Sequence, residues 1–180
     1  VLLQTTQRCV RQLSAGLPAM NHFVNISGNL LRHPAVVQEL LDTAMKSCMS
    51  CADVIGPVKP LVIEVTEREL LGDIPTARAL LKPFTDLGLR LALDDFGSGY
   101  SSFHYLSEFP FSFLKIEGSL VKHLDDPKVR TIVQGIQRIA EELDLITIVE
   151  FVENETIAAI AGDIGINWAQ GYYFGEPVLD

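Results

Sequence analysis

The chain contains little cysteine, and its single CxxC pair has no second Cys or His pair with which to bind a metal. Cys9, Cys48 and Cys51 are its three cysteines in 180 residues, too few for a disulfide framework, which favours a reducing compartment such as the cytoplasm. Cys48 and Cys51 have CxxC spacing, but no further Cys or His pair completes a tetrahedral zinc set. We therefore expect two thiols near a helix end rather than a zinc or redox site.

Basic residues and long apolar runs are also scarce. The 14 Lys and Arg against 23 Asp and Glu give a formal net charge of −9, which argues against DNA or RNA binding through clustered cations. A phosphate ligand would therefore need metal ions to hold it. No apolar run approaches the roughly 20 residues that cross a bilayer, and the start is amphipathic rather than a secretory signal. We expect no membrane contact by this segment.

What the chain does contain is a regular alternation of strand-like and helix-like segments. Helical spacing covers residues 1–16, 35–50, 74–87, 101–107, 118–143 and 154–162. Between them lie β-favouring runs, namely HFVNIS, LVIEVTE, RLALDDF, FSFLKIEG, ITIVEFVE and INWAQGYYFGEP. Several of these runs are apolar nearly throughout, as in parallel sheets buried on both faces. The order predicts an α/β barrel, with residues 1–180 as a single domain.

A polar residue stands at the end of each strand-like run. These residues are Asn25, Glu64, the pair Asp94 and Asp95, Lys115, Glu150 and Gln170, at intervals of 20 to 39 residues. Residues just past the carboxyl ends of barrel strands share one mouth, where such proteins do chemistry. Taken singly, Lys115 is typical of a surface lysine and Glu64 of a solvated carboxylate. Together they predict a divalent-metal site, because hard cations prefer oxygen ligands and relieve carboxylate repulsion.

Six ordered blocks carry a family resemblance. They are VNIS at 24–27, IEVTE at 63–67, DDFGSGYSS at 94–102, LKIEG at 114–118, VEFVE at 149–153 and QGYYFGEP at 170–177. The chain resembles the EAL family of cyclic-di-GMP phosphodiesterases, whose members fold as a modified TIM barrel. These bacterial signalling enzymes hydrolyse cyclic-di-GMP to 5′-pGpG with two Mg²⁺ or Mn²⁺ ions.

The resemblance also implies roles for individual residues. Asn25, Glu64, Asp94, Asp95 and Glu150 would bind metal or position water, with Lys115 beside the attacking water. Glu150 could also act as a general base. Substrate contacts would come from Ser27, Glu117, Gln170 and Pro177. Glu67 and the loop of Phe96, Gly97, Ser98, Gly99 and Tyr100 would couple the site to a homodimer interface.

Departures from the family pattern point to a segment of a longer protein and keep other functions open. The signature Glu-Ala-Leu strand is absent and only about six βα units are visible, whereas a closed barrel needs about 250 residues. We therefore expect that the missing strands lie upstream, that a partner chain supplies them, or that the sheet closes in an abnormal way. We also expect an upstream sensory or GGDEF-type domain, and unseen segments could tether the protein to the inner membrane. Phe151 replaces the usual glycine and Glu117 the usual aspartate.

Two other functions remain open. A degenerate domain would act as a cyclic-di-GMP receptor or as a signalling and dimerisation module. An unrelated barrel enzyme would use Lys115 for Schiff-base chemistry. Tyr172, Tyr173 and Phe174 are expected to close the core rather than to stack on a base.

Overall fold

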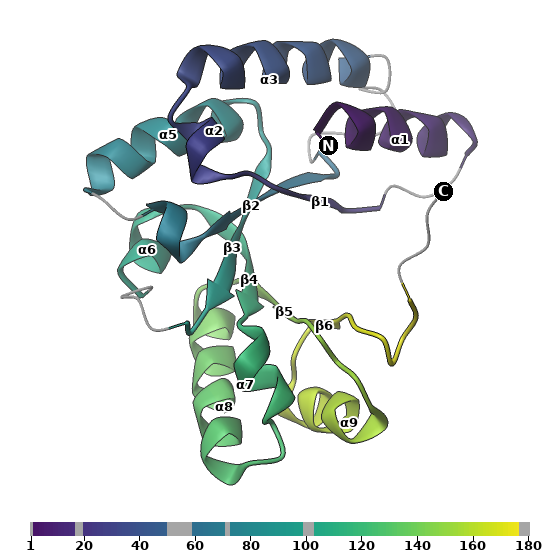
Figure 1. The fold of residues 1–180 in the computed structure, drawn as a ribbon, viewed down its shortest axis with the longest axis vertical. Coiled ribbons are helices and arrows are strands. Elements are labelled where there is room, and N and C mark those ends of the chain that lie inside the picture. The colour runs from purple at the N-terminus through teal and green to yellow at the C-terminus, as the bar shows by residue number, and fades with distance from the viewer. Residues whose placement is uncertain (1, 17–19, 50–58, 71–72, 99–102, 177–180) are drawn as a thin grey trace. The chain divides into compact units, whose positions relative to one another are not determined.

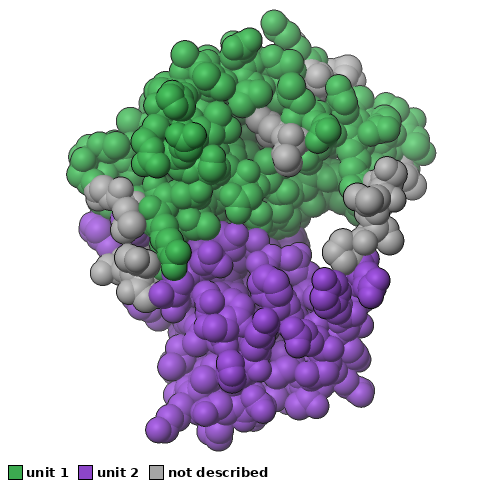
Figure 2. Space-filling model, in the orientation of Figure 1, with its two compact units in different colours: residues 1–92 green, residues 93–180 purple. Residues whose placement is uncertain are grey.

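The computed structural model, shown in Figure 1, describes residues 2–16, 20–49, 59–70, 73–98 and 103–176. The chain divides into two compact units, Val1–Ala92 and Leu93–Asp180, which are coloured separately in Figure 2. Their strands run in chain order, from β1 to β6, in a six-stranded sheet. The predicted α/β architecture with six βα repeats is confirmed.

Unit 1 contains α1 (Leu2–Ser14), β1 (His22–Asn25), α2 (Gly28–Leu31), α3 (Pro34–Met49), β2 (Leu61–Thr66), the 3₁₀ helix η1 (Glu67–Leu70), α5 (Ile74–Asp86) and the start of β3 (Arg90–Phe96). β1 pairs with β2 in parallel, with Asn25 opposite Glu64. Val62, Ile63 and Val65 on β2 are fully buried, as the unbroken apolar run predicts. Sequence analysis missed α2 and η1, whose single turns are too short to show a helical period.

Unit 2 continues from the end of β3 through α6 (Phe103–Glu108), β4 (Phe111–Ile116), α7 (Gly118–Lys122), α8 (Pro127–Glu142), β5 (Ile146–Val149), α9 (Glu155–Ile164) and β6 (Trp168–Ala169). β4 pairs with β5, and β5 with β6, both in parallel. Strand ends at Ile116, Val149 and Ala169 therefore follow one another along the same edge of this unit.

Two boundaries in unit 2 differ from the predicted ones. The single helix expected over 118–143 is broken between α7 and α8, where the Asp126 side chain caps α8 by accepting from Lys128 N at 2.7 Å and Pro127 opens the helix. Such an Asp-Pro start is a recognisable helix signal. The strand expected over 146–153 ends at Val149, and two residues later Phe151 adopts a left-handed backbone with φ of +57°. That conformation lies outside the extended region of a regular strand.

A buried polar network fixes the placement of β5 and β6. Thr147 Oγ1 lies 2.7 Å from Gln137 Oε1 and 2.9 Å from Asn167 Oδ1, and accepts a hydrogen bond from Asn167 N at 3.1 Å. Gln137 Nε2 donates to Gly165 O at 2.9 Å. Buried polar groups are costly unless they are paired, so this network favours one packing of α8 against the two strands.

The three aromatic residues after β6 do not close the core, so this expectation was wrong. Tyr172, Tyr173 and Phe174 are exposed, with Tyr172 at 70%. The segment turns through bonds from Gln170 N to Val149 O at 2.9 Å and from Tyr173 N to Val152 O at 3.0 Å. Within it, a Cβ on Gly171 would lie 2.3 Å from Val152 N, so only glycine fits this approach.

Candidate functional site

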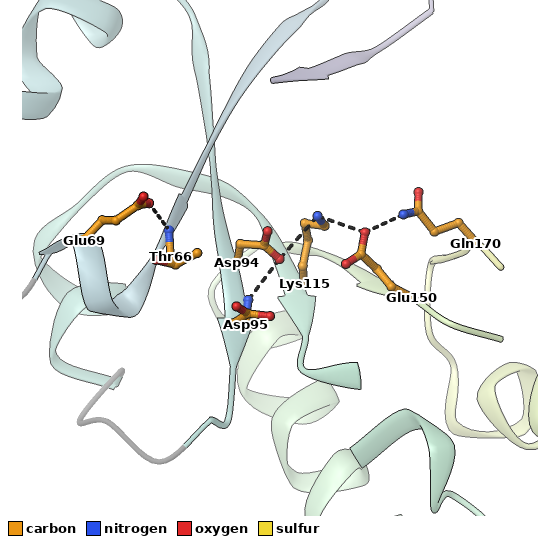
Figure 3. Close-up of polar contacts among 7 residues, drawn as sticks. All are labelled: Thr66, Glu69, Asp94, Asp95, Lys115, Glu150 and Gln170. Carbon is orange, nitrogen blue, oxygen red and sulfur yellow. Dashed lines mark hydrogen bonds and ion pairs between the residues drawn. The ribbon is translucent and has the colours of Figure 1, made fainter. Parts of the chain in front are cut away.

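Four of the predicted site residues meet in unit 2 around one buried lysine. Lys115 on β4 is only 6% exposed, and its Nζ lies 3.2 Å from Asp94 Oδ1 and 2.9 Å from Glu150 Oε1. Gln170 Nε2 donates a hydrogen bond to the same Glu150 oxygen. Figure 3 shows these contacts. We call Asp94, Lys115, Glu150 and Gln170 the Lys115 cluster.

Strand register explains how residues far apart in sequence reach this cluster. Lys115 pairs with Ile148 across β4 and β5, and Val149 pairs with Ala169 across β5 and β6. Glu150 and Gln170 therefore follow directly after paired residues. Because parallel strands end at the same edge, side chains placed just after them converge.

Asp94 and Asp95 point in different directions, as their adjacency on a strand requires. Asp94 is buried and Asp95 is exposed, and Asp95 has a positive φ of +56°. Asp95 N donates to Asp94 Oδ1 at 2.9 Å. Aspartate tolerates this backbone conformation better than most residues, so the local turn orients Asp94 toward Lys115.

Phe151 occupies the position next to Glu150 at a conformational cost. Its φ of +57° is unusual for a bulky residue, and its side chain is 55% exposed. The ring lies against Gly118, where a Cβ would come within 2.6 Å of it, and Lys122 Nζ lies 5.4 Å from its centroid. The backbone thus keeps the conformation typical of glycine, while the ring packs over α7.

A pocket of about 430 Å³ lies beside Glu150. Phe151, Gln170 and Tyr172 contribute to its lining. Its position next to the Lys115 cluster makes it a suitable concave surface for a ligand that contacts this cluster.

Asn25 and Glu64 lie in unit 1. They face each other in register across β1 and β2, and Ile26 N donates to Glu64 O at 3.0 Å. Asn25 is exposed, whereas Glu64 is 8% exposed, which makes it a buried rather than a solvated carboxylate. Ser27 caps α2 by accepting from Leu30 N at 3.4 Å. Glu67 is fully buried.

The remaining predicted residues lie in a helix cap, at or just after the end of β3, or outside the described residues. Glu117 caps α7 by accepting from Ser119 N at 2.9 Å. Phe96 is buried and meets the Phe103 ring edge-on at 5.2 Å. Gly97 has φ of +101°, and a Cβ there would lie 2.8 Å from Leu120; Ser98 N bonds Asp95 O at 3.2 Å. Gly99, Tyr100, Pro177 and Cys51 lie outside the described residues, as does the side chain of Cys48.

Sequence analysis missed Glu69 in unit 1. Its carboxylate accepts hydrogen bonds from Gly28 N at 2.8 Å and from Thr66 N at 3.0 Å. The first of these partners is 41 residues away in sequence, so no local sequence motif indicates this contact.

The donor chemistry of these strand ends fits hard divalent cations. Asp94 and Glu150 already direct carboxylate oxygens at one positive charge, the Lys115 ammonium. Carboxylate and amide oxygens are the preferred ligands of Mg²⁺ and Mn²⁺. Among the described residues, no three His, Cys, Asp or Glu side chains are already arranged to hold a metal. No helix in the described part is both long and apolar enough to cross a membrane.

Comparison with known proteins agrees with the strand-end pattern. The model of the EAL domain matches residues 1–177. The cyclic di-GMP phosphodiesterase PdeB of Shewanella oneidensis is 36% identical over 155 residues, which cover 86% of this chain but 17% of PdeB. This chain thus spans about a fifth of the length of the curated relatives that it matches.

Solved structures agree in fold. The PaMucR phosphodiesterase in complex with c-di-GMP superposes with a TM-score of 0.83 at 28% identity, over 98% of this chain and 69% of that one. A manganese and cyclic-di-GMP complex of Klebsiella pneumoniae BlrP1 gives a TM-score of 0.78 at 26% identity, over 95% and 42% of the two chains. From its family match and its TIM-barrel-like architecture, the chain belongs to the EAL domain family.

Proposed function

We propose that this chain is part of a metal-dependent phosphodiesterase that hydrolyses cyclic-di-GMP to 5′-pGpG in bacterial signalling. The observation that carries the proposal is the Lys115 cluster, in which a buried ammonium lies between two strand-end carboxylates. Related proteins are cyclic di-GMP phosphodiesterases or have been solved with cyclic-di-GMP.

The proposed cofactors are two Mg²⁺ or Mn²⁺ ions. By the family resemblance, Asn25, Glu64, Asp94, Asp95 and Glu150 would supply their ligands. When bound, such ions lower the pKa of a water molecule and stabilise charge on the phosphoryl oxygens. The oxygen donors of all five side chains suit this class of ion.

Three side chains of the Lys115 cluster have proposed roles in the reaction. Glu150 accepts the proton of the attacking water, since its carboxylate is partly exposed and borders the pocket. Lys115 orients that water and offsets negative charge as the P–O bond breaks. Gln170 holds Glu150 in place through its hydrogen bond. Ser27, Glu117, Gln170 and Pro177 are proposed to contact the dinucleotide.

The proposal extends to assembly. Glu67 and residues 96–100 would couple the metal site to a homodimer interface, as the family resemblance implies. The segment would work as one domain of a longer cytoplasmic protein that carries an upstream sensory or GGDEF-type domain.

One assay tests the activity. The protein is incubated with cyclic-di-GMP and Mg²⁺ or Mn²⁺, and the linear product is quantified by chromatography, with EDTA as the control. Formation of 5′-pGpG that EDTA abolishes supports the proposal. Binding of the dinucleotide without turnover would instead assign the chain a receptor function, which the bulky, conformationally strained Phe151 beside Glu150 favours.

A further inference from the structure

Glu69 joins two segments that lie close after proposed metal ligands, the start of α2 and the end of β2. It lies in η1, and its two carboxylate oxygens accept from backbone groups of different segments, Gly28 N at 2.8 Å and Thr66 N at 3.0 Å. Figure 3 shows the bond to Thr66. Charge-assisted bonds of this kind are about twice as strong as neutral ones.

The bond to Gly28 supplies a partner that α2 needs. The first N–H groups of a helix have no partner within the helix, and Ser27 accepts from Leu30 N rather than from Gly28 N. A Cβ on Gly28 would lie 3.2 Å from Glu69 Cγ. The glycine therefore leaves room for the carboxylate arm to pass close to the backbone.

The two Glu69 bonds also link the segment after β1 to the end of β2. Asn25 and Glu64 are partners in register, and Ile26 N to Glu64 O, at 3.0 Å, continues the ladder one residue past β1. Beyond that bond, Glu69 links the turn that follows Asn25 to Thr66, two residues after Glu64. Loss of this link would let the segments that follow Asn25 and Glu64 move apart.

We propose that Glu69 is a positioning residue that sets the spacing between Asn25 and Glu64 and thereby raises the affinity of unit 1 for a divalent cation. This inference rests on the proposed function, because it assumes that both residues bind metal. Groups that orient metal ligands typically contribute about 10- to 100-fold to metal affinity.

The test measures Mn²⁺ affinity by titration calorimetry and, separately, the free energy of unfolding in EDTA. Variants are Glu69→Ala, which removes both acceptors, and the milder Glu69→Gln, whose amide oxygen keeps one. The matched control is Asp73→Ala, because Asp73 likewise accepts from a backbone N–H, Thr76 N at 2.8 Å, at the start of α5.

We expect Glu69→Ala to weaken Mn²⁺ binding about tenfold or more, with a smaller loss for Glu69→Gln. Asp73→Ala should lower stability without changing Mn²⁺ affinity. Mn²⁺ affinity within twofold of wild type in both Glu69 variants would overturn the inference while leaving the proposed function intact. A wild-type chain that binds no Mn²⁺ would overturn the proposed function itself.

Discussion

Replacing Lys115 with methionine should separate the electrostatic role of the lysine from its packing role. Methionine has a similar length but no charge, so the variant leaves Asp94 and Glu150 facing each other without the ammonium that lies 3.2 and 2.9 Å from them. Breaking a buried ion pair by removing one partner costs about 3–5 kcal/mol. Glu150 is partly exposed, so solvent relieves some of its charge and we expect about 3 kcal/mol.

The loss of stability in Lys115→Met should depend on divalent cations. In EDTA, urea unfolding should show the full loss, whereas millimolar Mg²⁺ or Mn²⁺ should restore part of it, because an added cation again compensates the carboxylates. Turnover, which is measured with Mg²⁺ or Mn²⁺ present because EDTA is expected to abolish it, should fall by at least about 10²-fold, the lower range for losing a group that acts on the reacting water. Stability and its metal dependence are thus read independently of activity.

Lys82 is the matched control for this experiment. Its Nζ lies 2.6 Å from Asp86 Oδ2, closer than either pair of Lys115, but both side chains are more than half exposed. Exposed ion pairs contribute about 0–1 kcal/mol, so Lys82→Met should be nearly neutral. If Lys115→Met were as stable in EDTA as wild type, burial would not govern the strength of these pairs and the electrostatic argument would be refuted.

Three other substitutions test the site and its support. Glu150→Gln should lower turnover at least about 10²-fold in the phosphodiesterase assay, and a wild-type rate would remove Glu150 from the proposed mechanism. Phe151→Gly should raise the free energy of unfolding by up to about 1 kcal/mol, because it relieves a positive φ worth about 1–2 kcal/mol but also makes the unfolded chain more flexible. A clear loss in urea unfolding would show that the ring's packing dominates. Burial and the nearby Arg8 lower the pKa of His22 below its ordinary 6.5. The unfolded state then binds more protons. The contribution of His22 to stability should therefore be complete above about pH 6.5 and fall as the pH drops toward the pKa of the folded state. His22→Asn should flatten this dependence in thermal melts recorded between pH 5 and 7, and an unchanged slope would assign it to other groups.

The parts of the fold that could be predicted from sequence are those set by local patterns. Apolar runs such as LVIEV and RLALD predicted β2 and β3 because a strand buried on both faces tolerates few polar residues. The polar residue at the end of each run placed Lys115 near Asp94 and Glu150, since parallel strands end at one edge. Adjacency of Asp94 and Asp95 predicted a turn, and Asp95 has a positive φ.

The features that sequence did not reveal depend on contacts between distant segments. Glu69 bonds to Gly28, 41 residues away, and nothing near Glu69 distinguishes it from a surface carboxylate. Phe151 leaves the extended backbone conformation just after β5, although phenylalanine is a residue that favours strands. The ring finds room because residue 118 is glycine, a pairing visible only once both segments are placed.

The surroundings of Lys115 also argue against one of the functions that the sequence left open, the enzyme that forms a Schiff base. A Schiff base requires a neutral amine, which attacks a carbonyl carbon. Lys115 is buried between two carboxylates at 3.2 and 2.9 Å, and nearby opposite charges favour the protonated ammonium. A nucleophilic lysine is usually found in apolar surroundings or beside another cation, either of which disfavours the charged form. The same two carboxylates that make Lys115 a poor nucleophile offer oxygen ligands to divalent cations, as the proposed phosphodiesterase requires.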